Sequence, residues 1–291
     1  MTQVDADVED HGRLIVQGAD RPGIVATVSG ALTECGANIV SLDQHSSDPF
    51  GGRFFQRTVF HLPELSGRLP ELRQRLDTRL CEELELGWRL VEVARPKRVA
   101  IFVSRADHCL LDLLWRQRRG ELAMDVAMVV SNHDDLRDDV SRFGIPYFVV
   151  PVPRQDKAAA EKEQLNLLAG NVDLVVLARY MQVLSSQFLD DVGVPVINIH
   201  HSFLPAFTGS RPYHQAKQRG VKLIGATAHY VTEQLDEGPI IEQDVIRVSH
   251  GDSVQDLQRR GADVERLVLS RAVAWHCDDR VVRDGNTTVV L

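Results

Sequence analysis

An amide precedes an imidazole by two residues in the apolar run Val196-Ile197-Asn198-Ile199-His200. If this run is a strand, alternate side chains share a face, so Asn198 and His200 point the same way and the two isoleucines pack on the other side. An amide can donate a hydrogen bond to a developing oxyanion, and an imidazole can exchange a proton near neutral pH. The spacing alone favours a plainer interpretation, a polar strand end whose hydrogen bonds are already satisfied.

A carboxylate lies farther along the chain, in the turn sequence Asp236-Glu237-Gly238-Pro239. Aspartate and glycine are ordinary turn residues, so the turn by itself indicates no chemistry. A carboxylate beside His200 could orient the imidazole, or move a proton to and from a water molecule. Spacing cannot bring Asp236 to His200, so this assignment depends on the fold.

Other histidines lie near the same run, but their spacing matches no common metal-ligand pattern such as H-E-x-x-H. They are His201, His214 and His229. We therefore expect no metal site. The cysteines form no C-x-x-C pair, which predicts free thiols in a reducing compartment. They are Cys35, Cys81, Cys109 and Cys277.

The composition excludes several classes of function. The chain has 291 residues, with 33 lysines and arginines against 41 aspartates and glutamates, and a formal net charge of −8. This acidic balance argues against broad nucleic-acid binding, which needs a basic surface, and still allows an anionic small molecule. No apolar stretch reaches the roughly 18 residues of a membrane helix, and the acidic first residues are unlike a leader peptide. We expect a cytoplasmic protein that binds neither membranes nor nucleic acid.

Strands and helices alternate regularly from residue 97 onward, which predicts a Rossmann-like, mostly parallel α/β sheet. The expected strands are 99–103, 125–130, 147–150, 172–177, 194–199, 223–231, 240–248 and 287–291. The expected helices are 108–118, 135–143, one that ends near residue 169, and 253–276 with Ser253 at its N-cap. Ligands of open α/β sheets bind at the carboxyl ends of the strands, where Asn198 and His200 would lie.

The residues before this part follow a different order, βαββαβ, which is typical of a small α+β sandwich. The expected strands are 13–17, 38–42, 54–62 and 88–93, and the expected helices are 24–35 and 69–84. Pro22 suits the first helical turn, and Gly36 suits the residue just past the helix end. We predict two domains, residues 1–93 and 98–291, joined by a linker at 94–97.

Two segments of the first domain carry a resemblance to a known family. They are Asp20-Arg21-Pro22-Gly23-Ile24-Val25 and Gly36-Ala37-Asn38-Ile39. With the βαββαβ order, they resemble the ACT family of amino-acid-sensing modules. The resemblance implies a homo-oligomer, a dimer or a tetramer, and an effector such as glycine or methionine. The implied effector residues are Asp20, Arg21, Pro22, Gly23, Asn38 and Ile39. Backbone N–H groups of a strand-to-helix turn can hold a carboxylate, but an ordinary helix start without a ligand is the alternative.

The second domain carries a resemblance too. Its segments Asn198-Ile199-His200, Leu204-Pro205 and Asp236-Glu237-Gly238-Pro239-Ile240 are similar to the hallmark of the folate-dependent formyltransferase family. Segments 107–115, 131–136, 207–216 and 224–230 extend the match toward the deformylases of that family. The resemblance implies hydrolysis of 10-formyltetrahydrofolate to tetrahydrofolate and formate, which would balance one-carbon pools and supply formate for purine synthesis. Asn198 and His200 would stabilise the oxyanion, and Asp236 would position or deprotonate water. The folate would be the substrate, with no cofactor.

The resemblance also implies a loop that holds the pterin after a central strand. It consists of Arg179, Tyr180, Met181, Gln182, Val183 and Leu184. Core packing of Met181, Val183 and Leu184, and a surface ion pair of Arg179, are the alternatives. A basic cluster could meet the glutamyl tail of the folate, although a solvated face is the more ordinary interpretation. It consists of Lys217, Arg219 and Lys222.

The loop after the first strand of the second domain bears on the formyl acceptor. It reads Ser104-Arg105-Ala106-Asp107-His108, without glycine and with an acid that would repel a phosphate. Water is then the expected acceptor. A formyltransferase that acts on an unphosphorylated amine is the alternative. A third possibility, an amino-acid sensor with an inactive catalytic fold, requires a broken catalytic set, yet Asn198, His200 and Asp236 are all present.

Overall fold

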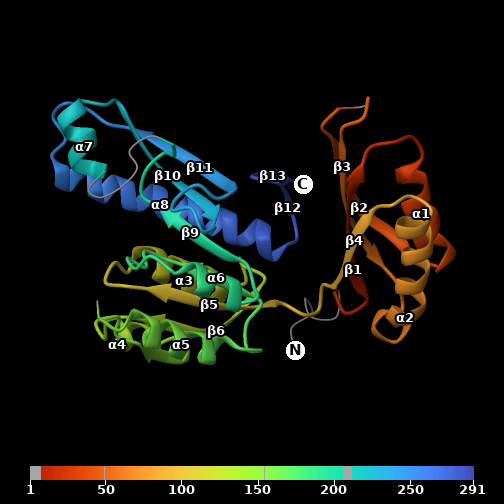
Figure 1. The fold of residues 1–291 in the computed structure, drawn as a ribbon, viewed down its shortest axis with the longest axis horizontal. Coiled ribbons are helices and arrows are strands. Elements are labelled where there is room, and N and C mark those ends of the chain that lie inside the picture. Colours follow the sequence, from red (N-terminus) through yellow and green to blue (C-terminus); the bar gives the residue numbers. More distant parts are fainter. Residues whose placement is uncertain (1–7, 49, 154, 206–211) are drawn as a thin grey trace. The chain divides into compact units, whose positions relative to one another are not determined.

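The computed structural model describes residues 8–48, 50–153, 155–205 and 212–291. The described chain forms two compact units, coloured in sequence order in Figure 1. The first contains residues up to 96 together with 279–282 and 289–291, and the second contains residues 97–278 and 283–288. Among the described residues, no helix combines the length and apolar character that crossing a membrane requires.

The first unit is a four-stranded antiparallel sheet in the order β2-β3-β1-β4, with α1 and α2 on one face (Figure 1). Its elements are β1 (His11–Ala19), α1 (Ile24–Glu34), β2 (Asn38–Ser46), β3 (Arg53–His61), α2 (Leu65–Leu76), a π-helical turn (Asp77–Glu82) and β4 (Gly87–Glu92). This confirms the predicted βαββαβ order. Gly36 follows α1 with a φ of 78°, as expected for the residue past a helix end, but Pro22 lies before the helix, whose N-cap is Gly23.

The C-terminal residues complete the first unit. β12 (Val281–Asp284) and β13 (Thr287–Val290) pair as a hairpin, and Val282 and Leu291 are buried against Ile15 and Phe55. The sequence predicts these residues as part of the second domain, whereas 279–282 and 289–291 pack with the first unit. The sequence gives little indication that β12 and β13 pair, because each strand is only four residues long.

The second unit is a seven-stranded sheet in the order β11-β10-β9-β8-β5-β6-β7. The pairs from β9 to β7 are parallel, and β10 is antiparallel to both of its neighbours, which confirms the predicted fold class. The strands are β5 (Lys97–Val103), β6 (Met124–Ser131), β7 (Tyr147–Val149), β8 (Leu174–Leu177), β9 (Val196–His200), β10 (Leu223–Tyr230) and β11 (Ile240–Arg247). The helices are α3 (His108–Arg118), α4 (Arg137–Ser141), α5 (Lys157–Leu168), α6 (Ser186–Asp191), α7 (Pro212–Arg219) and α8 (Val254–Cys277).

The central strands explain the apolar runs in the sequence. Residues 99–103 of β5 are fully buried, because helices cover both faces of a parallel sheet. A side chain of this kind contributes about 1.5–3 kcal/mol when it leaves water. The carboxyl ends of β5, β6, β8 and β9 therefore meet at one edge of a rigid sheet.

The longest helix, α8, packs along β9, β10, β11 and α3 (Figure 1). Ser253 caps its N-terminus, and a capping box with Asp256 confirms that prediction. The buried stripe of α8 is apolar except for a few residues, and Glu265 is the charged one. A buried carboxylate needs partners, so this position indicates a polar cluster. The sequence pattern does not predict α6 and α7, because both helices are short and mostly polar.

Candidate active site

The pairing of β9 with β10 fixes the first two candidate residues. Asn198 lies opposite His229, and His200 lies opposite Thr227. The isoleucines between them are buried on the other face, as the alternation in the sequence predicts. His200 is buried at the carboxyl end of β9, so its imidazole lies at the edge where ligands of such sheets bind.

A tight turn brings the distant carboxylate to this edge. Gly238 passes so close to β10 that a Cβ there would lie 1.8 Å from the carbonyl oxygen of Tyr230. Asp236 adopts a φ of 60°, a left-handed conformation that costs a non-glycine residue free energy and is concentrated at functional sites. Its Oδ1 lies 3.3 Å from Nδ1 of His200. The fold thus brings Asn198, His200 and Asp236 to one place, which spacing alone could not do.

His229 contacts two of these three residues, Asn198 and Asp236, whereas its position in the sequence suggested only a metal ligand. Its Nδ1 faces the carbonyl oxygen of Tyr230 at 3.0 Å, so this nitrogen carries the proton. In the neutral ring, Nε2 then accepts a hydrogen bond from the Asn198 amide at 3.2 Å, and it lies 3.7 Å from Oδ1 of Asp236. His229 therefore orients the amide. The alternation of small residues with Thr227 and His229 in β10 was the available signal.

The electrostatics favour an ionised Asp236. Burial favours the neutral acid, but the hydrogen bond from His200 and the charge of that ring outweigh it and hold the pKa of Asp236 well below its usual range. Nδ1 of His200 faces this carboxylate, whereas its buried Nε2 has no hydrogen-bond partner in the described chain. Because a buried polar atom is normally paired, this nitrogen is available to a reacting group. The arrangement can stabilise an oxyanion and relay a proton.

The loop after β8 begins at the same edge. The carbonyl oxygen of Arg179 accepts a hydrogen bond from the Ser104 backbone at 3.3 Å, and the Met181 N–H donates to Oγ of Ser104 at 3.0 Å. Met181 is 58% exposed and Val183 is 57% exposed, so core packing does not account for them. Leu184 packs against the core, and Gln182 is half-buried.

Tyr180 and Arg179 differ from what the sequence predicts for a substrate-binding loop. The Tyr180 ring lies in the core edge-on to Phe102, and its hydroxyl accepts a hydrogen bond from Gln164 at 2.9 Å. The Tyr180 side chain therefore points into the core, whereas its neighbour Met181 is exposed on the surface of the loop. Arg179 is no surface ion pair either: its side chain is mostly buried, and Nη1 lies 3.5 Å from Oε2 of Glu265.

Glu265 is the centre of a second polar cluster, which the sequence analysis missed. Its carboxylate is 2% exposed and accepts hydrogen bonds from the Tyr213 hydroxyl at 2.6 Å and from Nε2 of His108 at 2.8 Å. Burial favours the acid form, but the hydrogen bond from His108 and the charge of Arg179 outweigh it and lower the pKa of Glu265 to about 2. We call Glu265, His108, Arg179 and Tyr213 the Glu265 cluster.

Within the described ranges, the one group with the proximity of metal ligands is His108, Cys109 and Glu265. Arg179 approaches the carboxylate oxygen that His108 also contacts, so a cation already balances this charge. Burial raises the pKa of the Cys109 thiol, which keeps it protonated and a poor ligand. The contacts describe an ion-pair cluster, and the absence of a metal stays a prediction.

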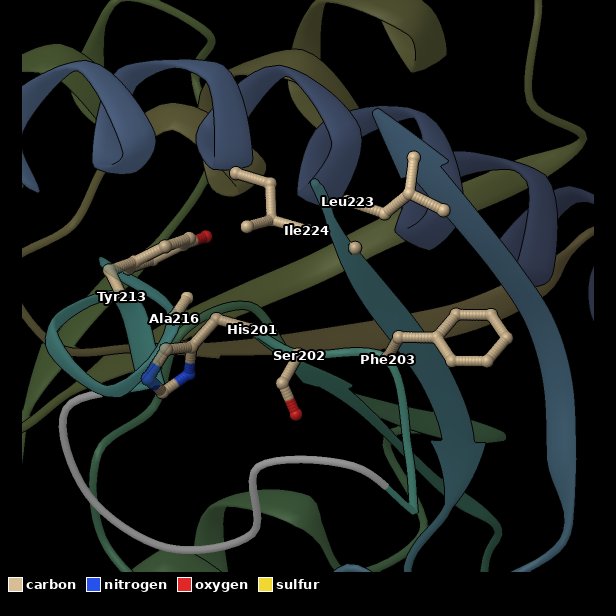
Figure 2. A pocket seen from close by; sticks show the side chains of 8 residues that line it. His201, Ser202, Phe203, Tyr213, Ala216, Leu223 and Ile224 are labelled. Carbon is tan, nitrogen blue, oxygen red and sulfur yellow. The ribbon is translucent and has the colours of Figure 1, made fainter. Parts of the chain in front are cut away.

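A small pocket lies beside Tyr213 of the Glu265 cluster and His201, the neighbour of His200 (Figure 2). It is lined by His201, Ser202, Phe203, Tyr213, Ala216, Leu223, Ile224 and Gly225. Figure 2 shows the rings of His201 and Tyr213 on the same side of it, with centroids 6.0 Å apart. The His201 ring also lies 5.4 Å from the His200 ring. Burial and the charge of Arg179 lower the pKa of His201 to about 4, so its ring is neutral at physiological pH.

The first unit has a cavity of its own beside the turn that leads into α1. It is lined by Asp20, Arg21, Gly23, Ile24, Val25, Ala26, Ser29, Gln44 and Phe54. Three of the six predicted effector residues, Asp20, Arg21 and Gly23, are in this lining, whereas Pro22, Asn38 and Ile39 are not. Among the basic residues of the second unit, Lys217 donates to the carbonyl oxygens of His250 and Asp252.

Comparison with known proteins decides the family. Residues 12–77 match the ACT domain family, and residues 97–273 match the formyl transferase family. A formyltetrahydrofolate deformylase of Mycobacterium tuberculosis is 60% identical over 97% of this chain and 91% of the relative. The chain belongs to the formyltetrahydrofolate deformylase family. The deformylase of Bacillus subtilis is 48% identical over 97% of this chain and 94% of the relative.

Solved structures agree with membership of the deformylase family. The crystal structure of a formyltetrahydrofolate deformylase from Pseudomonas syringae has a TM-score of 0.91 at 48% identity, and covers 97% of this chain and 94% of its own. A glycinamide ribonucleotide transformylase from Symbiobacterium toebii has a TM-score of 0.64 at 32% identity, and covers 67% of this chain and 94% of its own. Deformylase relatives therefore match both units, whereas this transformylase matches about two thirds of the chain.

Proposed function

We propose that this chain hydrolyses 10-formyltetrahydrofolate to tetrahydrofolate and formate, with Asn198, His200 and Asp236 as its catalytic residues. The observation that carries the proposal is the His200–Asp236 contact of 3.3 Å beside Asn198, at the carboxyl end of β9. Similarity to deformylases over nearly the full chain supports the same reaction.

The reaction follows from these three side chains. The oxygen of a water molecule bonds to the formyl carbon, and the Asn198 amide and His200 stabilise the oxyanion that develops. Asp236 positions or deprotonates this water, and relays its proton to N10 of the folate as the C–N bond breaks and formate leaves. Each group supplies a factor of about 10²–10⁴ in rate. His229 positions the Asn198 amide, so that its second N–H is directed to the substrate.

The loop after β8 supplies the proposed pterin surface. Met181 and Val183 expose apolar side chains where Ser104 anchors the backbone. A flat heterocycle that covers them would release water from both side chains. Arg179 and Tyr180 contribute backbone rather than side chains, because their side chains are buried elsewhere.

Water as the acceptor is supported by the loop after β5. Residues 104–108 include no glycine, and Asp107 stands at the N-terminus of α3, where a phosphate would otherwise be favoured. The imidazole of His108, the first residue of α3, is already hydrogen-bonded to the Glu265 carboxylate. Transfer to an unphosphorylated amine is the second candidate, because these contacts argue only against a phosphate.

The deciding experiment incubates the purified protein with 10-formyltetrahydrofolate and no amine, and measures formate and tetrahydrofolate together. Hydrolysis predicts equal amounts of the two products at a rate that added amines do not change. Strict dependence on an amine would establish the transferase, and no turnover under either condition would favour a sensor with an inactive catalytic unit.

The first unit is proposed to bind an amino-acid effector in the cavity beside α1. Polar side chains of Asp20, Arg21 and Gln44 line it together with apolar Ile24 and Phe54, a combination that suits a small zwitterion. Glycine and methionine are the proposed effectors of a cytoplasmic homo-oligomer, a dimer or a tetramer. Adding each amino acid to the acceptor-free assay should change the rate for one of these two, and light scattering gives the oligomeric state.

A further inference from the structure

The Glu265 cluster has no part in the proposed reaction, although it lies next to it. Its members come from four separate places: the start of α3, the loop after β8, α7 and α8. The other three side chains turn to the Glu265 carboxylate, which accepts from Tyr213 on one oxygen and from His108 on the other. Two hydrogen bonds and an ion pair on one buried carboxylate restrict its movement, so the cluster fixes the positions of the groups at its border.

Tyr213 is the member at the border with the active site. Its hydroxyl is held by Glu265, and its ring lies beside His201, which in turn lies beside His200. The glycine at position 261 of α8 leaves room for this phenol. A Cβ at Gly261, one turn before Glu265, would lie 1.9 Å from the Tyr213 hydroxyl. The sequence of α8 therefore provides both the anchor and the space for the ring.

We propose that Tyr213, anchored by Glu265 and seated over Gly261, is a specificity-determining residue that restricts the formyl acceptor to water. This inference rests on the proposed hydrolysis and deepens it. The His201 ring lies 5.4 Å from the His200 ring and 6.0 Å from the Tyr213 ring. In this proposal the His201 and Tyr213 rings form a wall beside His200, and they fill space that an amine larger than water would need to reach the formyl carbon. Loop 104–108 excludes a phosphate by charge, and the wall excludes an unphosphorylated amine by volume.

Removing the wall should open a second reaction. In a Tyr213→Ala variant, an amine nitrogen would bond to the formyl carbon as the bond to N10 breaks. N10 would take the proton that the amine loses, and an N-formyl amine would replace formate. The probes are glycinamide and hydroxylamine, two small amines without phosphate. The measured quantity is the ratio of formate to tetrahydrofolate, with the N-formyl product identified by mass spectrometry.

Wild-type protein should give a ratio of one with or without either amine. Tyr213→Ala should give a ratio below one that falls as amine is added, and the missing formate should appear as N-formyl product. Tyr213→Phe keeps the ring and loses only the hydroxyl, so it should keep a ratio near one. Gly261→Ala should displace the phenol and repeat the effect of Tyr213→Ala. Gly67→Ala in α2, where nothing lies within 4 Å of the added Cβ, is the matched control.

The outcomes separate the two proposals. If wild-type protein releases no formate without an amine, the proposed hydrolysis fails whatever the variants do. If Tyr213→Ala and Gly261→Ala turn over with a ratio of one at every amine concentration, Tyr213 does not select the acceptor. If both variants are folded by circular dichroism yet make neither product, Tyr213 serves turnover itself, which also overturns the inference.

Discussion

Two carboxylates of the second unit, the buried Glu265 and the largely buried Asp236, have different surroundings. Both oxygens of Glu265 accept hydrogen bonds, and a guanidinium lies close by. Asp236 lies in a strained turn and faces a histidine whose other nitrogen has no partner in the described chain. A carboxylate held on both oxygens by buried side chains is fixed in place, whereas the unpartnered nitrogen of His200 beside Asp236 can bond to a reacting group. We therefore assign a structural and selective role to Glu265 and a catalytic role to Asp236.

The largest expected effect comes from Asp236. Asp236→Asn removes the negative charge that faces His200 and should lower kcat by about 10²–10⁴-fold, with little change in folate binding. Rate measurements and a folate titration by fluorescence check this. Glu237→Gln, at the exposed neighbour in the same turn, changes the charge equally and should keep full activity. A fully active Asp236→Asn variant would remove Asp236 from the mechanism.

Glu265 should affect stability more than rate. Glu265→Ala leaves Arg179 and His108 without their carboxylate, and losing one partner of a buried ion pair costs about 3–5 kcal/mol in the free energy of unfolding. Denaturant titration measures this. Glu163→Ala, at an exposed position of α5, should change stability by less than about 0.5 kcal/mol. If the two variants were equally stable, the Glu265 cluster would have no structural role.

The pH dependence of stability should follow the same carboxylate. The pKa of Glu265 is lowered from its usual 4.5 to about 2 in the folded protein. The ionised form thus contributes stability that is complete above pH 4.5 and is lost as the pH falls through about 2. The difference in unfolding free energy between wild type and Glu265→Gln should be largest near neutral pH and shrink across this window. A difference that grew toward acid would reverse the assignment.

The smallest effects are expected on the proposed pterin surface. Replacing Met181 or Val183 by alanine removes apolar surface that the substrate would cover, and should raise KM about fivefold with kcat unchanged, which corresponds to about 1 kcal/mol. Val245→Ala, at an exposed position of β11, is the matched control and should leave KM unchanged. An unchanged KM in both loop variants would place the pterin elsewhere.

The sequence was sufficient for features that depend on local pattern. The apolar runs predict the central strands, and the alternation in β9 predicts the shared face of Asn198 and His200. Ser253 predicts the start of α8. The contact of Asp236 with His200 came from resemblance to a family, since the chain must first pass through β10 and a turn that Gly238 makes possible.

The Glu265 cluster could not be predicted in the same way. His108, Arg179, Tyr213 and Glu265 are spread over more than half of the chain, and none is within local contact range of another. One signal existed, an acidic residue in the apolar stripe of an amphipathic helix, but its partners depend on how four elements pack. The role of His229 could not be predicted from the sequence either, because it follows from the pairing of His229 opposite Asn198 and not from a motif.

The hairpin that ends the chain determines where this protein can be cut. Val282 and Leu291 cover Ile15 and Phe55. A fragment that stops near residue 96 would therefore expose these two apolar side chains to water and be prone to aggregate. A purification tag appended after Leu291 would extend from a buried residue. Expression of the amino-terminal module alone should therefore supply residues 279–291 as a linked or co-expressed peptide.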